Sequence, residues 1–329
     1  MSDTVSDAIN RNDLDELLRL VDAFTDTREW DELVDLKQRA RDAFERGRQL
    51  WPAASRAEYR LALDAPAPYA AAVLTDDAGR FAFGPLSEVA ASTHPWAELA
   101  PHAPPTPAAA LAAHERVLRG EQIDPKTVVH AEVLSVPLHL ERWEPGYFLA
   151  TYRPDRVEVD DPEPVRGRPL TLPTKSARSV DDLDVTDALR DLVSSWTARS
   201  EGTARVVCVE GTAEDAIAAL AGATTAVRGA EIDAGDALAR LAWAGASGAR
   251  HGRRRGAATG RDLAWAAAGA LAGFPSGERA EPGALGDAIS ELRWLVWNAP
   301  DVTTGWVLRL AIEDPVDGVA WGCDAVDPA

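Results

Sequence analysis

The chain has 329 residues, of which 46% are hydrophobic and 26% charged, and its formal net charge is −19. This length predicts two domains rather than one core, and the composition excludes a chain that is disordered throughout. Two cysteines exclude a disulfide framework, and the acidic balance means that any anionic partner must be held locally.

The first part of the chain has the pattern of amphipathic helices. Short helices separated by Pro-rich breaks continue to about Gly120. We therefore predict a helical domain over residues 1–124, and helix pairs with short turns favour a HEAT-like or TPR-like stack. The first helix face is marked by Leu14, Leu17, Leu18, Val21 and Phe24.

The composition changes after residue 124, where β-branched and aromatic residues become frequent. The stretches TVVHAEVLSVPLHL, GYFLATY and RVEVDD are typical of strands. We predict a second, mixed α/β domain over residues 125–329, with a long Pro-rich surface loop at about 150–180.

Strands and helices then alternate toward the C-terminus. ARVVCVEG and TTAVRGAEID read as strands, and each is followed by a helical stretch. LGDAISELRWLVWN reads as one further helix, and two final strands joined by PVDG predict a β-hairpin. The expected fold class is α+β or α/β, with the helical domain first.

The N-terminus lacks the basic and apolar regions of a signal peptide. No apolar run reaches the roughly 18 residues that a membrane span requires. These two features predict a cytoplasmic protein without a membrane partner.

The stretch GASGARHGRRRGAATGR, Gly245–Arg261, concentrates positive charge in this acidic chain. An apolar helix precedes it, and a new helix is expected to begin near Gly256. Backbone N–H groups at a helix N-terminus and arginine guanidinium groups both bind phosphate or carboxylate. We therefore predict a ligand-binding site for an anion, formed by Gly245, Ser247, Gly248, Arg250, His251, Arg253, Arg254, Arg255 and Arg261.

Several known motifs do not fit this stretch. It has no Walker A lysine, and the element before it is helical, unlike that of a dinucleotide fingerprint. GASGA resembles the G-x-S-x-G elbow, but that elbow follows a strand, which argues against Ser247 as a nucleophile. His251 is the one candidate for moving a proton. The alternative is a solvated turn that pairs with the protein's own carboxylates.

The segment LAWAGASGARHGRRRGAATGRDLAW resembles one in uncharacterised actinobacterial proteins that carry W-A-x-A-S-G-x-x-H-G-R-R-R-G-A-A. That family has no assigned activity, so the resemblance implies a lineage and no mechanism. Ala249 stands here where the family tends to have glycine.

Other polar patterns are weaker. His130 and Glu132 would share one face of a strand, and the pairs Asp160–Asp161 and Asp181–Asp182 could hold a hard cation, but we assign no metal site. The tryptophans near the arginine stretch are read as core rather than as stacking platforms for bases; they are Trp243, Trp265, Trp294 and Trp297.

Three functions remain from the sequence alone. The first is binding of a phosphorylated or other anionic small ligand at Gly245–Arg261, with or without catalysis. The second is a non-enzymatic interaction or assembly module that uses the helical domain and the arginine-rich turn to dock a protein partner or a second copy. The third is nucleic-acid binding, which needs a wider positive surface than this chain supplies. No cofactor is indicated.

Overall fold

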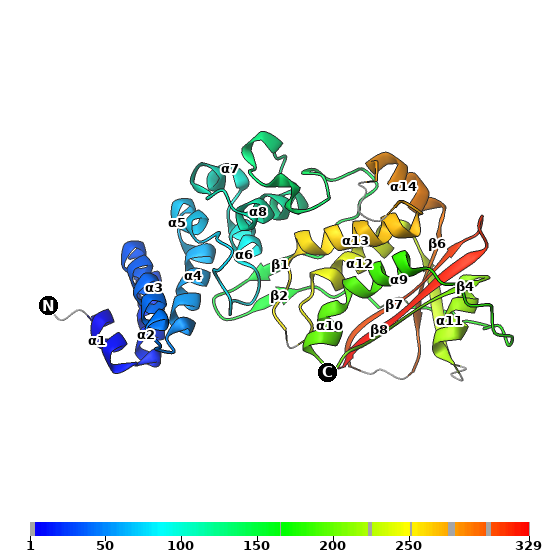
Figure 1. Cartoon of the computed structure of the whole chain (residues 1–329), viewed down its shortest axis with the longest axis horizontal. Helices are drawn as coiled ribbons and strands as arrows, with labels where there is room; N and C mark the ends of the chain where they lie inside the picture. Colours follow the sequence, from blue (N-terminus) through cyan, green and yellow to red (C-terminus); the bar gives the residue numbers. More distant parts are fainter. Residues whose placement is uncertain are drawn as a thin grey trace. The chain divides into compact units, whose positions relative to one another are not determined.

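The computed structural model describes residues 4–164, 166–222, 226–250, 252–275, 280–300 and 304–328 (Figure 1). The chain forms two compact units. Unit 1 comprises Met1–His139 and Leu149–Val159, and unit 2 comprises Leu140–Phe148 and Asp160–Ala329. Within the described ranges, no helix combines the length and the apolar character needed to span a bilayer.

Unit 1 is built from helices packed through their apolar faces. Leu17 and Val21 of one helix and Leu33 of the next are fully buried, as the spacing predicts. The Asp13 carboxylate accepts the Glu16 N–H at 3.0 Å and caps its helix. The elements are α1 (Thr4–Arg11), α2 (Leu14–Thr27), α3 (Trp30–Glu45), α4 (Trp51–Asp64), α5 (Ala67–Ala72), α6 (Leu86–Thr93), α7 (Trp96–Leu99), η1 (Ala100–His102) and α8 (Pro107–Leu118).

The strand predicted over TVVHAEVLSVPLHL is wrong. The chain forms only two short 3₁₀ turns there, η2 (Pro125–Thr127) and η3 (Ala131–Val133). Proline cannot donate to a strand ladder, and His130 adopts a left-handed conformation with φ 61°, which interrupts an extended chain. Strands appear afterwards as the antiparallel pair β1 (Ala150–Tyr152) and β2 (Val157–Val159).

Unit 2 contains an antiparallel six-stranded sheet in the order β3-β5-β6-β7-β8-β4. The predicted final hairpin is confirmed, with Gly305 opposite Pro328 and Asp314 opposite Val319. The strands are β3 (Arg168–Pro169), β4 (Thr203–Glu210), β5 (Arg228–Ile232), β6 (Arg293–Asn298), β7 (Gly305–Asp314) and β8 (Val319–Pro328).

Helices cover both faces of this sheet. One face packs its Leu295 and Trp297 against Ala213 and Ile217 of a single helix, α11. On the other face, the Trp321 indole donates to Asp182, the N-cap of α9, at 2.8 Å. The helices of unit 2 are α9 (Leu183–Leu192), α10 (Ser194–Arg199), α11 (Ala213–Ala221), α12 (Ala234–Ala246), α13 (Ala257–Leu271) and α14 (Pro282–Glu291).

The helix predicted over LGDAISELRWLVWN is half wrong. Helix α14 ends at Glu291, and RWLVWN forms β6. Its alternating large residues pair with β5 on one side and β7 on the other, so sheet packing overrides the helical reading of the whole stretch. Trp294 and Trp297 therefore lie in a strand, and both are buried, as the core interpretation predicts.

Candidate functional site

The loop between α12 and α13 closes tightly on itself. The Arg255 N–H donates to the Ala246 carbonyl at 2.8 Å. A Cβ at Gly248 would lie 1.6 Å from the Arg253 carbonyl oxygen, so this turn requires glycine. Gly256 is the N-cap of α13 at φ 105°, which confirms the helix start predicted there. The predicted residue His251 lies outside the described residues.

The small predicted residues serve packing and hydrogen bonding in this structure. Gly245 lies inside α12, where a Cβ would be 3.2 Å from the Cα of Gly260 on α13. The buried Ser247 hydroxyl donates to the Ala244 carbonyl at 2.6 Å and accepts from the Trp196 indole at 2.6 Å. The Ser247 hydroxyl is therefore engaged on both its donor and its acceptor side.

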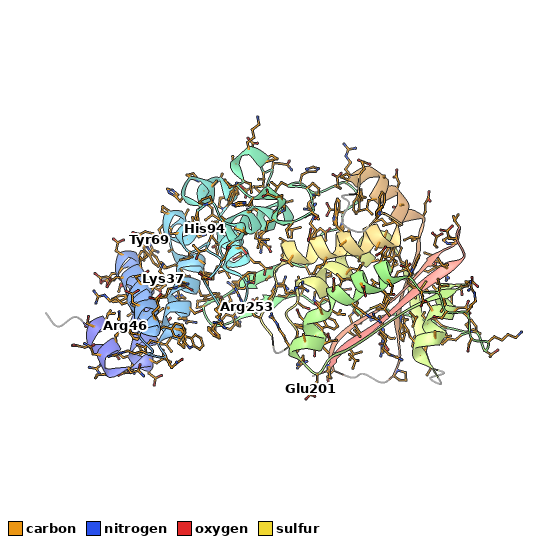
Figure 2. All side chains as sticks on the ribbon, in the orientation of Figure 1. Lys37, Arg46, Tyr69, His94, Glu201 and Arg253 are labelled. Atoms are coloured by element: carbon orange, nitrogen blue, oxygen red, sulfur yellow. The ribbon has the colours of Figure 1, made fainter. Side chains whose placement is uncertain are left out.

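The five arginines of the stretch lie in different environments. Arg250 is exposed, and its backbone N–H donates to the buried Asp327 at 2.7 Å. Arg253 is half-buried and precedes the buried Arg254 in the loop that leads into α13 (Figure 2). The Arg255 guanidinium donates to the Asp191 carbonyl at 3.2 Å. Burial lowers the pKa of Arg255; Asp191 partly opposes this shift, and Arg199 adds to it. Arg261 is 1% exposed.

Arg261 is held by Glu144, a residue that sequence reasoning missed. The two side chains form a bidentate pair, with Nε–Oε2 at 2.7 Å and Nη2–Oε1 at 2.6 Å. Glu144 also accepts from the Trp265 indole at 3.0 Å, the Tyr147 hydroxyl at 2.5 Å and the Glu141 N–H at 2.8 Å. Burial alone would raise the Glu144 pKa, but these donors, Arg261 first, hold it below its usual value. We call this group the Glu144 cluster.

A second feature of unit 2 is a pocket of about 500 Å³ where β6 and β7 separate. The two strands pair from Arg293 opposite Glu313 to Val296 opposite Leu310. Beyond that point β6 continues along β5, and β7 continues along β8. The opening, which we call the fork pocket, is lined by Val296–Asn298, Thr304–Leu310, Asp161–Pro164, Arg240 and Trp243.

The fork pocket reaches side chains of both sheet faces. Successive residues of a strand point to opposite faces, and the lining includes Leu308 together with Arg309, and Val296 together with Trp297. Trp297 packs on the α11 face. A gap between strands therefore explains this pocket better than a depression on one face.

Two arginines, Arg240 and Arg309, and two carboxylates, Asp161 and Glu163, line the fork pocket. Arg309 is 5% exposed, and its Nε lies 2.8 Å from Oδ1 of Asp324. The same carboxylate also pairs with Arg205 at 2.6 Å. Arg240 donates to the Glu163 carbonyl at 2.8 Å; burial lowers its pKa, and Asp236 opposes that shift.

Tryptophans connect the fork pocket to the arginine loop. Trp243 and Trp306 line the pocket with ring centroids 5.8 Å apart. Both contact Trp196, at 5.9 Å and 6.0 Å, and the Trp196 indole holds Ser247 at the start of the loop. The predicted stretch is thus coupled by packing to a pocket that its own residues do not line.

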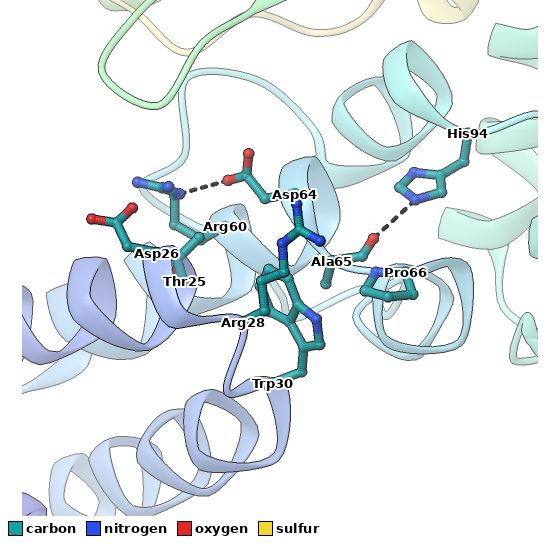
Figure 3. Close-up of a pocket in the computed structure, with 9 residues that line it drawn as sticks. All are labelled: Thr25, Asp26, Arg28, Trp30, Arg60, Asp64, Ala65, Pro66 and His94. Atoms are coloured by element: carbon teal, nitrogen blue, oxygen red, sulfur yellow. Dashed lines mark hydrogen bonds and ion pairs between the residues drawn. The ribbon is translucent and has the colours of Figure 1, made fainter.

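Unit 1 contains a pocket of its own, of about 580 Å³, shown in Figure 3. Two of its charged lining residues, Arg60 and Asp64, pair with each other. Arg60 pairs with Asp64 at 2.6 Å and with Asp22 at 3.0 Å. His94 contacts the Ala65 carbonyl through Nε2 at 2.9 Å, as Figure 3 shows.

The remaining polar patterns give no metal centre. His130 and Glu132 approach to 3.5 Å, but on a 3₁₀ turn rather than on a strand face. Asp182 caps α9, at Val185 N. Among the residues that the structure describes, no three His, Cys, Asp or Glu side chains are grouped to hold a metal ion.

A family model matches most of the chain. The model of a family of unknown function (DUF6183) matches residues 15–314. The chain belongs to this family. No curated protein and no solved structure matches it.

The DUF6183 match covers both the predicted loop and the fork pocket. The sequence contained signals for the pocket only in part. Arg309 alternates with apolar residues on a predicted strand of the hairpin, and a buried position for a charged side chain is unusual there. The fork pocket opens where β6 stops pairing with β7, and no local sequence pattern predicts that position.

Proposed function

We propose that unit 2 binds a small anionic ligand, phosphorylated or carboxylated, in the fork pocket. The observation that carries this proposal is the lining of one 500 Å³ pocket by two arginines and three tryptophans. Ligand sites of this size are mostly apolar and aromatic, with a few polar groups that fix orientation. The ligand class is the one that the arginine stretch predicts, but its position is beside the loop.

The two guanidinium groups of the lining support an anion as the ligand. The chain carries −19 overall, so its general field repels anions. Inside the pocket Arg240 and Arg309 offset the two carboxylates of the lining, Asp161 and Glu163, so the lining does not share the negative excess of the chain. A bound anion would stabilise both guanidinium groups in a partly desolvated site.

The loop between α12 and α13 contacts the pocket wall indirectly, through Trp196. Ser247 fixes Trp196, which contacts the two wall tryptophans Trp243 and Trp306. Arg261 is already neutralised by Glu144. The loop arginines would then set the position of α12, which carries Arg240 and Trp243, and only indirectly affect the ligand.

The test is a thermal-shift screen of the full chain against nucleotides, sugar phosphates, aromatic carboxylates and simple anions, followed by calorimetric titration. A true ligand at a hundredfold excess over its dissociation constant adds about 2.7 kcal/mol of stability. Arg240→Gln and Arg309→Lys should each weaken binding at least tenfold, since each alters a guanidinium beside the ligand.

Arg19→Gln is the matched control, because Arg19 lies in unit 1 with a side chain that is 70% exposed. It should leave the titration unchanged. A wild-type chain that binds none of these anions, or pocket variants that bind as tightly as wild type, would refute the proposal.

A further inference from the structure

The indole N–H groups of unit 2 differ in one respect. Five buried or half-buried tryptophans donate to a protein oxygen at 2.6–3.0 Å. They are Trp143, Trp196, Trp265, Trp294 and Trp321. Trp297 is 1% exposed, yet among the described residues its Nε1 has no hydrogen-bond partner.

Trp297 is also a lining residue of the fork pocket. A buried donor without an acceptor is unfavourable, and native structures rarely retain one without a reason. The Arg309 guanidinium carbon lies 4.9 Å from the centre of the Trp297 ring. A positive charge and an unused N–H donor are therefore adjacent at one pocket wall.

One wall of the pocket is aromatic and apolar. Trp243 and Trp306 meet at 69° and 5.8 Å, and Leu308 and Leu310 follow along β7. A simple inorganic anion would fill little of the 500 Å³ and would leave the half-buried Trp306 and Val307 in contact with water. A planar aromatic group would bury them and gain ring contacts.

We propose that the ligand of the fork pocket is an aromatic molecule with one anionic head, and that Trp297 Nε1 donates a hydrogen bond to that head beside Arg309. This deepens the proposed function and rests on it. Trp297 is then a specificity-determining residue, because a site with a buried donor discriminates against ligands that lack the matching acceptor. The aromatic part lies against Trp243 and Trp306.

Indole N–H resonances in two-dimensional NMR of the full chain test this assignment. The probes are 1-naphthyl phosphate, inorganic phosphate and 1-naphthol, which supply both parts, the anion alone and the ring alone. Trp297→Phe identifies the Trp297 signal by its loss. We expect 1-naphthyl phosphate to shift that signal and to bind at least tenfold more tightly than either partial probe.

Trp297→Phe keeps an aromatic ring and removes the donor. It should therefore lower the affinity for 1-naphthyl phosphate by about tenfold, which corresponds to the loss of one charge-assisted hydrogen bond. Trp294→Phe is the control on the same strand, because Trp294 lies on the opposite sheet face and donates to the Ile289 carbonyl. It should leave affinity unchanged.

The outcomes separate the two proposals. In one outcome 1-naphthyl phosphate binds, and its affinity depends on Arg240 and Arg309, but it does not shift the Trp297 signal and binds the Trp297→Phe variant as tightly as wild type. This inference then fails and the proposed function stands. Equal affinity for inorganic phosphate also overturns the inference alone. If 1-naphthyl phosphate does not bind while another anion does, the aromatic class is wrong; if no anion binds, both are wrong.

Discussion

Arg261 and Arg309 are both almost fully buried arginines of unit 2, and each is paired with a carboxylate. Arg261 meets Glu144, whose side chain is wholly enclosed and accepts from four side-chain and backbone groups. Arg309 shares Asp324 with Arg205 and lines an open pocket. The two arginines are similarly buried and differ in the space beside the guanidinium, which is why only Arg309 belongs to the proposed binding site.

The first way to test this comparison is to break the closed pair. Glu144→Gln keeps the shape of the side chain but leaves the Arg261 charge uncompensated inside the protein. Removing one partner of a buried ion pair costs about 3–5 kcal/mol. We expect that loss in the free energy of unfolding of unit 2, measured by denaturant titration, with ligand affinity per folded molecule little changed.

Glu201→Gln is the matched control, because Glu201 is exposed in the same unit (Figure 2). Its free energy of unfolding should stay within about 0.5 kcal/mol of wild type. A Glu144→Gln protein as stable as this control would show that the closed pair does not stabilise the unit.

A second change sharpens the comparison by testing whether the arginine stretch acts through helix packing. A Cβ at Gly260 would lie 2.2 Å from the Ala242 carbonyl oxygen, whereas a Cβ at Gly269 on the same helix meets nothing within 4 Å. Gly260→Ala should lower the free energy of unfolding by about 1–3 kcal/mol, because the added methyl group overpacks the contact between the helices. Gly269→Ala should stabilise by about 0.5–1 kcal/mol, since alanine favours a helix interior.

Thermal or denaturant unfolding of the two variants measures this difference directly. Equal effects of both substitutions would mean that the close contact between α12 and α13 is not maintained in solution. The loop would then be less able to position Arg240 and Trp243.

The smallest expected effect is a pH dependence of the Glu144 cluster. The folded-state pKa of Glu144 lies below its unperturbed value of 4.5. A depressed carboxyl pKa contributes stability above the unfolded-state pKa and loses it as the pH falls through the folded-state pKa. The stability difference between wild type and Glu144→Gln should therefore shrink below about pH 4.5, and a difference that stays constant to pH 3 would contradict this.

The sequence supports local features more reliably than distant ones. The helix start at Gly256 follows from glycine and alanine chemistry within a few residues, and the β7–β8 hairpin follows from two alternating stretches around PVDG. The sequence does not separate β6 from α14, because the helix and the strand adjoin without a break at Leu292. Pairing with β5 and β7 makes this segment a strand, and the local hydrophobic pattern of the segment contains no information about those two partners.

The Glu144 cluster and the fork pocket show the same limit. Arg261 is conspicuous in the sequence, but its partner Glu144 precedes it by 117 residues. Nothing in the sequence around Glu144 distinguishes it from the other acidic residues. Arg240, Trp297 and Arg309 come from three separate elements. Residue types indicated an anion site in this part of the chain, whereas the position of the pocket depends on where two strands stop pairing.

The short segment Leu140–Phe148 belongs to unit 2 although stretches of unit 1 precede and follow it. On the ribosome this segment emerges together with unit 1, long before its arginine partner has been synthesised. Glu144 must stay hydrated until α13 leaves the exit tunnel, because a carboxylate cannot be buried without compensation. Completion of unit 2 is therefore a late event in translation, and a nascent chain arrested before Arg261 would leave Glu144 unburied.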